Sequence, residues 1–168
     1  ASTIQTFTIN SSTILLKTNC LIFASNDITL TLPEVTASDT GLMITVKNTG
    51  SHIQLVNVKG YDLATIENQD TIGILPGLIY SFVARGTNWV LLNGENYNDD
   101  ILDVGPDETF QTISHAIDFL NIHMDKPMVL RIGGETENIS NTIVIDLPYS
   151  LTIQGSSYGV GSIAAASG

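Results

Sequence analysis

Short segments in which apolar and polar residues alternate fill the first ninety or so residues of the chain. A period of two places the apolar side chains of a strand on one face, and the Gly, Asn and Pro residues between the segments are typical of turns. The triplet Arg85-Gly86-Thr87 is typical of a hairpin loop. The pattern predicts an antiparallel β-sandwich or small barrel over residues 1–96, with strands at 6–9, 27–32, 42–46, 53–58, 80–84 and 88–92.

A helical period appears only after residue 108. Thr109 precedes apolar residues that are three, three, one and three positions apart: Phe110, Ile113, Ala116, Ile117 and Leu120. This spacing predicts an amphipathic helix within 109–124, with Thr109 as its N-cap. Pro127 ends the helical pattern.

Apolar segments return after the predicted helix, at 128–132, 138–145 and 150–155. Strands that follow one helix at intervals of about 10 to 20 residues indicate a stacked, parallel arrangement. The acidic, glycine-containing residues 97–108 then read as a linker between a β-domain at 1–96 and a second unit at 109–168.

Composition narrows the classes of function. The chain has 168 residues, of which 43% are hydrophobic and 14% charged, so it can bury a core and does not resemble a disordered chain. Its net charge of −11 would repel phosphate, and no apolar run approaches the roughly 20 residues of a membrane helix. We therefore expect neither a nucleic-acid partner nor membrane insertion. The single cysteine, Cys20, lies among apolar residues and is expected to be a buried thiol.

Residues 44–50, 70–72, 75–77 and 85–92 carry a resemblance to a known β-module. The sequences Ile-Thr-Val-Lys-Asn-Thr-Gly, Asp-Thr-Ile, Leu-Pro-Gly and Arg-Gly-Thr-Asn-Trp-Val-Leu-Leu resemble a module of phage tail fibres and other virion appendages. Arg85 stands where a small acidic residue is more usual in that module. The resemblance implies a structural, usually trimeric, β-rich fibre domain without catalytic residues.

A second resemblance covers 104–106, 110–118, 129–132, 137–139 and 151–155. These segments are similar, in the same order, to the entry of a right-handed parallel β-helix of the pectin-lyase-like superfamily. The predicted helix then resembles the cap over the first coil. Gly134-Glu135-Thr136 stands where the superfamily usually has an aromatic residue. The superfamily's catalytic residues lie in later coils, so none is carried over.

Two groups of residues could bear chemistry, and each also has a simpler interpretation. Glu135 and Glu137 would face the same side of a strand, as a pair of carboxylates that cleaves a glycoside requires, yet they suit a solvated turn better. His115 and Asp118 are three apart on the predicted helix, without a nucleophile in a suitable context. We assign no catalytic residue and no cofactor.

Oxygen ligands for calcium are the third candidate chemistry. They are offered by four residues of the linker region: Asn98, Asp99, Asp100 and Asp103. The segment lacks the glycine and the glutamate of an EF-hand loop, which favours a solvated acidic turn. We therefore assign no metal site.

Aromatic side chains are candidates for contact with a glycan, because their faces suit the apolar patches of sugar rings. The candidates are Trp89, Tyr97 and Tyr158, although apolar neighbours make a core position the more favoured interpretation for Trp89.

Together these features predict a mainly β fragment of a longer protein: a structural, host-attachment component of a phage-like appendage, located on the virion or outside the cell. The alternatives are the N-terminal part of a β-helical, polysaccharide-degrading tailspike and a secreted bacterial adhesin. We expect no enzymatic activity from the fragment itself. Expected partners are two further copies in a homotrimer, other virion proteins, and a glycan or protein receptor on the host surface.

Overall fold

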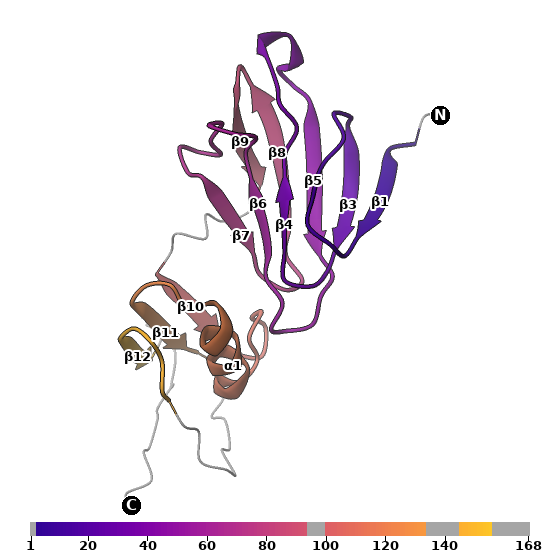
Figure 1. Ribbon diagram of the computed structural model, residues 1–168. Coiled ribbons are helices and arrows are strands. Elements are labelled where there is room, and N and C mark those ends of the chain that lie inside the picture. The colour runs from indigo at the N-terminus through magenta and orange to yellow at the C-terminus, as the bar shows by residue number, and fades with distance from the viewer. Residues whose placement is uncertain (1–2, 94–99, 134–144, 156–168) are drawn as a thin grey trace, which may run out of the picture. The chain divides into compact units, whose positions relative to one another are not determined.

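The computed structural model describes residues 3–93, 100–133 and 145–155 (Figure 1). The chain divides into two compact units, Ala1–Tyr97 and Asn98–Gly168. Twelve strands, one α-helix and one 3₁₀-helix in the described residues confirm the mainly β class. None of the helices described is long and apolar enough to cross a membrane.

Nine strands form two sheets in the first unit. Sheet A has the order β1-β3-β5-β8-β9, and sheet B has the order β2-β4-β6-β7. Their bounds are β1 (Gln5–Ile9), β2 (Thr13–Ile14), β3 (Cys20–Ala24), β4 (Ile28–Thr31), β5 (Met43–Asn48), β6 (Val56–Lys59), β7 (Thr71–Ile74), β8 (Ile79–Arg85) and β9 (Asn88–Asn93). A short 3₁₀-helix, η1 (Ala37–Asp39), lies between β4 and β5.

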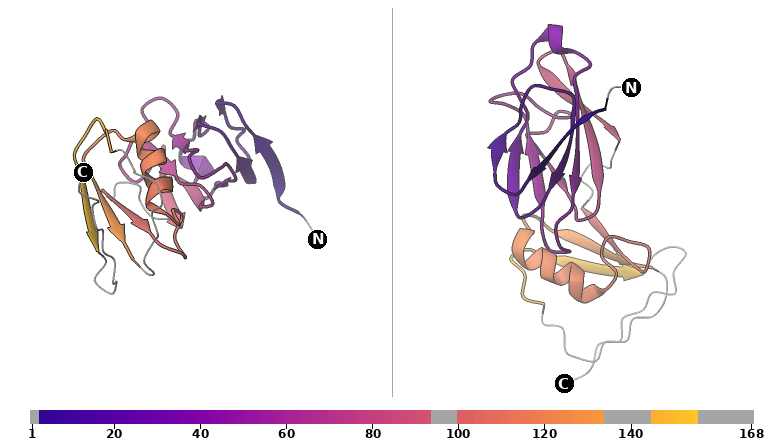
Figure 2. Two further views of the ribbon diagram at one scale, coloured as in Figure 1. Left: turned by 90° about the horizontal axis from the view of Figure 1, so that it is seen from below. Right: turned by 90° about the vertical axis from the view of Figure 1, so that its right-hand side faces the viewer.

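The chain passes from sheet A to sheet B three times in succession, from β1 to β2, from β3 to β4 and from β5 to β6, so it forms three stacked coils (Figures 1 and 2). Corresponding strands of neighbouring coils pair in parallel, with Gln5 opposite Cys20 and Cys20 opposite Ile44. The prediction of antiparallel pairing is wrong for these strands and for β2–β4–β6. It is correct for β5–β8, β6–β7 and the hairpin β8–β9.

The physical reason for this difference lies in the turns. Alternation reports which face of a strand is buried, but the connecting turn decides where the next strand lies. The turns at 10–12, 25–27 and 49–55 lead the chain to the opposite sheet instead of back beside the strand it has left. The two-residue turn Gly86-Thr87, with Gly86 at φ +63°, instead folds β8 back on β9, and the longer connection 60–70 folds β6 back on β7.

One apolar core lies between the two sheets. Sheet A contributes Ile22, Ile44 and Phe82, and sheet B contributes Leu30 and Val58, all of them 0–1% exposed. Cys20 belongs to the same cluster, which confirms the buried thiol, and burial raises its pKa. A single core filled from two sheets explains why alternation is so regular in most of these strands.

Backbone hydrogen bonds join each coil turn to the turn before it. The amide of Ser25 donates to the carbonyl of Ile9 (3.1 Å), and one coil later the amide of Thr49 donates to the carbonyl of Ala24 (2.7 Å). The Asn26 side chain extends this series, because its Nδ2 donates to the Asn10 carbonyl (2.9 Å). The turns are therefore part of the stack and not loose connections.

Asn48, the last residue of β5, holds the third turn together from inside. It is 0% exposed, and its Nδ2 donates to the carbonyls of Gln54 (2.9 Å) and Ile74 (2.8 Å). Its Oδ1 accepts from the amide of Gly50 (2.9 Å). One side chain thus ties the end of sheet A to the turn and to β7 of sheet B.

The described residues of the second unit form a parallel sheet of three strands, β10 (Ile101–Val104), β11 (Met128–Ile132) and β12 (Leu151–Gly155). The strands are in register, with Leu102 opposite Leu130 and Leu130 opposite Ile153. This confirms the predicted parallel arrangement for 128–132 and 150–155. Part of the predicted linker 97–108 is in fact a strand, β10, whose apolar pair Leu102 and Val104 is buried. The predicted strand at 138–145 falls, up to residue 144, outside the described residues.

Helix α1 (Ile113–His123) lies within the predicted range 109–124 and has five buried side chains. Its N-cap is Thr112, whose Oγ1 accepts from the amide of His115 (3.2 Å), and not Thr109 as predicted. The helix starts late because Phe110 forms a parallel bridge with Val104 and its carbonyl accepts from the Gly105 amide, which keeps this residue extended. The ring of Phe110 packs against that of Phe119, with centroids 5.0 Å apart and the planes tilted by 53°.

Candidate functional sites

Of the residues considered for catalysis, two belong to α1. His115 is half-buried there, and Asp118 is exposed. Glu135 and Glu137 lie outside the described residues. His123, in the last turn of α1, packs against the ring of Phe119 with centroids 4.7 Å apart. Packing is thus the visible role of α1.

The two described carboxylates of the calcium candidate face cations of the protein itself. Asp100 forms an ion pair with Lys126 (2.9 Å). Asp103 accepts from both Nε (2.6 Å) and Nη2 (3.1 Å) of Arg131, its direct neighbour across β10 and β11. Both pairs join the start of the unit to the segment after α1, while Asn98 and Asp99 lie outside the described residues. Within the part of the chain described, no group of three or more metal-binding side chains occurs.

The aromatic candidates divide by position. Trp89 is 1% exposed within the core cluster, so a sugar cannot stack on its ring, and the glycan role considered for it is wrong. The ring is buried because Trp89 alternates inward on β9, where its amide and carbonyl also bond to the loop at Thr65 and Glu67. Tyr97 and Tyr158 lie outside the described residues, so their role as glycan contacts remains a prediction.

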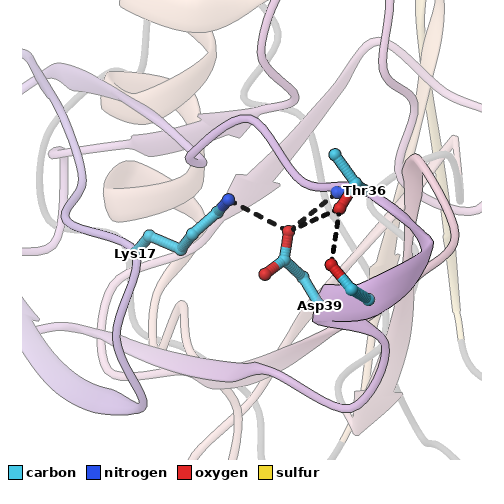
Figure 3. Close-up of polar contacts among 4 residues, drawn as sticks. Lys17, Thr36 and Asp39 are labelled. Carbon is cyan, nitrogen blue, oxygen red and sulfur yellow. Dashed lines mark hydrogen bonds and ion pairs between the residues drawn. The ribbon is translucent and has the colours of Figure 1, made fainter.

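A polar cluster joins the loop after β2 to η1 (Figure 3). Oδ2 of Asp39 accepts from the amide of Thr36 (2.8 Å) and from its hydroxyl (3.2 Å), and it pairs with Lys17 Nζ (3.0 Å). The Thr36 amide is the main reason that the pKa of Asp39 lies below its usual value, and Lys17 adds to the effect. This arrangement closes the short helix by a capping box, so its role is structural.

A partly open apolar cavity of about 250 Å³ lies where the first coil leaves the core uncovered. Strands β1 and β3 and the segment at 13–16 line it, with Phe7, Ile9, Leu15, Cys20 and Ile22 as the main apolar contributors. It presents hydrocarbon surface and the weakly polar thiol of Cys20. Such a cavity suits an apolar side chain and has no group placed for catalysis.

The outer face of sheet A carries many apolar side chains. Strand alternation places seven large apolar side chains there, and all are partly or fully exposed: Leu21, Phe23, Met43, Ile79, Val83, Val90 and Leu92. The exposed fraction reaches 44% for Ile79 and 65% for Leu92. One sequence signal for this surface is the apolar run Leu42-Met43-Ile44, where a strand with one solvated face would alternate. The unbroken apolar run at 20–24 was the signal that could have extended it.

Comparison of the chain with protein-family models, with curated proteins and with solved structures finds no match. Inference about function therefore depends on the geometry described above and on the sequence resemblances.

Proposed function

We propose that the chain is a structural, host-attachment component of a phage-like virion appendage, which acts by assembly and presentation. The observation that carries this proposal is the stacking of in-register parallel strands in both units: β1-β3-β5 and β2-β4-β6 in the first, β10-β11-β12 in the second. Stacks of this kind extend along one direction, with each layer contacting only its neighbours. That construction suits a rigid support that holds a binding tip away from a particle.

The finer fold belongs to the same proposal. We regard the first unit as a sandwich-like fibre module and the second as the first coils of a right-handed parallel β-helix, with α1 as its cap. The connection from β10 through α1 to β11 joins two parallel neighbours, and such crossovers are right-handed in about 98% of cases. The buried side chains of α1, with Phe110, Leu102 and Leu130, provide the apolar layer that a cap requires.

Labelling of particles tests the proposal directly. Antibodies raised against the purified chain would be applied to virus-like particles from a culture of the organism that carries the gene and followed by electron microscopy with gold. Label on appendages supports the proposal. Label on the cell envelope alone contradicts it and favours a secreted adhesin.

A β-helical polysaccharide-degrading tailspike is the second candidate. It is favoured by the parallel sheet β10-β11-β12, in which β12 is the last of the described strands, so that further coils would stack on it. Release of reducing ends from host polysaccharide by the full-length protein would establish this reading. We expect the fragment alone to release none.

A further inference from the structure

The two sheets of the first unit have outer faces of opposite character. The outer face of sheet A, defined above by its seven apolar side chains, contrasts with that of sheet B. Alternation on sheet B places five polar side chains outward, with the exposed Ile14 of edge strand β2 as the apolar exception. The polar ones are Thr29, Thr31, Asn57, Lys59 and Thr71. Both sheets cover the same core, so burial within the unit does not explain the difference. If the outer faces of both sheets were in contact with water, both would be expected to be polar.

The seven apolar side chains lie on four of the five strands, because the outward residues of β1 are Thr6 and Thr8. One row across the sheet is wholly apolar. Met43, Val83 and Val90 are direct neighbours across β5, β8 and β9. Beside this row, the hydroxyls of Thr45 and Ser81 bond to each other (2.8 Å). The polar groups at the centre of the face thus have hydrogen-bond partners already, so removing water from them costs less than removing it from unpaired hydroxyls.

The distribution of charge indicates what kind of partner fits this face. The chain has 17 acidic and 6 basic residues, yet no acidic side chain points outward from the described strands of sheet A. The charges there are cationic, Lys47 and Arg85. Two copies of so acidic a chain repel one another, and the repulsion is weakest where acids are missing. The outward residues of sheet B contain no acid either, so charge permits a second copy to approach the outer face of sheet A, and the apolar side chains there distinguish it from sheet B.

The size of the face can be compared with that of a stable interface. Five strands about 4.8 Å apart and about five residues long at 3.3 Å each cover roughly 400 Å² in projection. A stable pair of proteins buries about 800 Å² on each partner. The outer face of sheet A would therefore supply about half of that area before the relief of its side chains is counted.

We propose that copies of this chain associate through the outer face of sheet A. The inference rests on the proposed function in one respect: a fibre component is expected to self-associate, and the face gives that association a surface. Twisted sheets pack face to face at about 10 Å, with their strands inclined by about 30°, so a face of this kind can pack against its own copy.

Sedimentation at micromolar concentration tests the inference with three variants. Val83→Lys places a charge between Met43 and Val90 in the apolar row, and Leu92→Lys places one on a side chain that is 65% exposed, where folding should not suffer. Asn57→Lys serves as the matched control, because it places the same charge at a half-buried residue on the outer face of sheet B. Emission from the buried Trp89 verifies that each variant is folded.

We expect the unmodified chain to sediment as a multiple of 18.0 kDa. The two sheet A variants should weaken self-association and raise its dissociation constant by about tenfold or more. The control should leave the dissociation constant unchanged. Two or three copies both support the inference. If the sheet A variants associate as tightly as the unmodified chain, copies do associate but not through the outer face of sheet A, and the inference is overturned while the proposed function is not. A monomer at all concentrations overturns the inference and the homotrimer together, and particle labelling then decides the attachment function separately.

Discussion

Replacing Asn48 with alanine should destabilise the first unit more than the substitution of a side chain on its surface would. The substitution removes two donated hydrogen bonds, to the carbonyls of Gln54 and Ile74, and one accepted from the amide of Gly50. Water cannot easily replace them, because Asn48 is 0% exposed. The three partner groups then remain in the folded protein with no replacement for the lost side chain.

The magnitude follows from the burial of each contact. Leaving a buried polar group unpaired costs about 1–3 kcal/mol, and a typical hydrogen bond contributes about 0.5–1.5 kcal/mol net. The bond to Ile74 is buried and the other two are partly buried, so the expected loss is about 3 kcal/mol. With a urea m-value of about 1–1.5 kcal/mol per molar, the unfolding midpoint falls by about 2–3 M.

Urea unfolding followed by tryptophan fluorescence measures this loss. Trp89 is the only tryptophan of the chain and lies in the core of the same unit. Asn57→Ala is the matched control, since Asn57 is half-buried on the outer face of sheet B and should change stability by about 0.5 kcal/mol or less. Asn48→Asp should be worse than Asn48→Ala at neutral pH, because an ionised carboxylate has no hydrogen to donate to the two carbonyls. If Asn48→Ala and the control unfold at the same urea concentration, Asn48 does not hold the turn.

Three further predictions concern separate parts of the chain. Gly60→Ala should lower the unfolding temperature more than Gly50→Ala. The new Cβ at position 60 would lie 2.2 Å from the backbone oxygen of Ala64, which cannot move away easily. The new Cβ at position 50 would lie 2.2 Å from the end of the Gln54 side chain, which can. Asp39→Asn should be less stable than the unmodified chain at neutral pH, and calorimetry should show that this difference shrinks below about pH 4. The reason is that the pKa of Asp39 is lowered in the folded protein. Such a carboxylate contributes stability above its unfolded-state pKa, and the contribution is lost as the pH falls through its folded-state pKa. Thr112→Ala should reduce the stability of the second unit by about 1 kcal/mol, measured by circular dichroism, while Thr109→Ala should not, because only Thr112 caps α1; equal losses would restore Thr109 as the cap.

Local patterns in the sequence predicted the elements that depend on nearby residues. The hairpin β8–β9 follows from a two-residue turn, and α1 follows from a helical spacing of apolar residues. The parallel coils of the first unit could not be predicted in this way. Strand partners such as Gln5 and Cys20 are fifteen positions apart, and the turn that separates them has no local signature for direction.

Strand β3 shows a second limit of pattern reading. Its sequence, Cys-Leu-Ile-Phe-Ala, is apolar throughout and was not assigned as a strand. The reason is that Cys20 and Ile22 face the core while Leu21 and Phe23 face outward on the apolar side of sheet A, so alternation disappears. For the candidate sites, the sequence indicated that Trp89 favours the core, but it gave no means of finding the pairing of Asp103 with Arg131 across two strands.

The coil arrangement of the first unit also sets the order in which it should fold and open. A hairpin closed by two residues needs little loop entropy, whereas parallel pairing over fifteen or more positions requires longer loops to close first. Strands β1 and β2 lie at the sheet edges and have no fully buried residue, whereas β5 and β8 have several. The N-terminal coil should therefore join last and detach first. In a cell, a protease that samples brief openings would enter the unit through this coil, and the core formed by the remaining strands would outlast the cut.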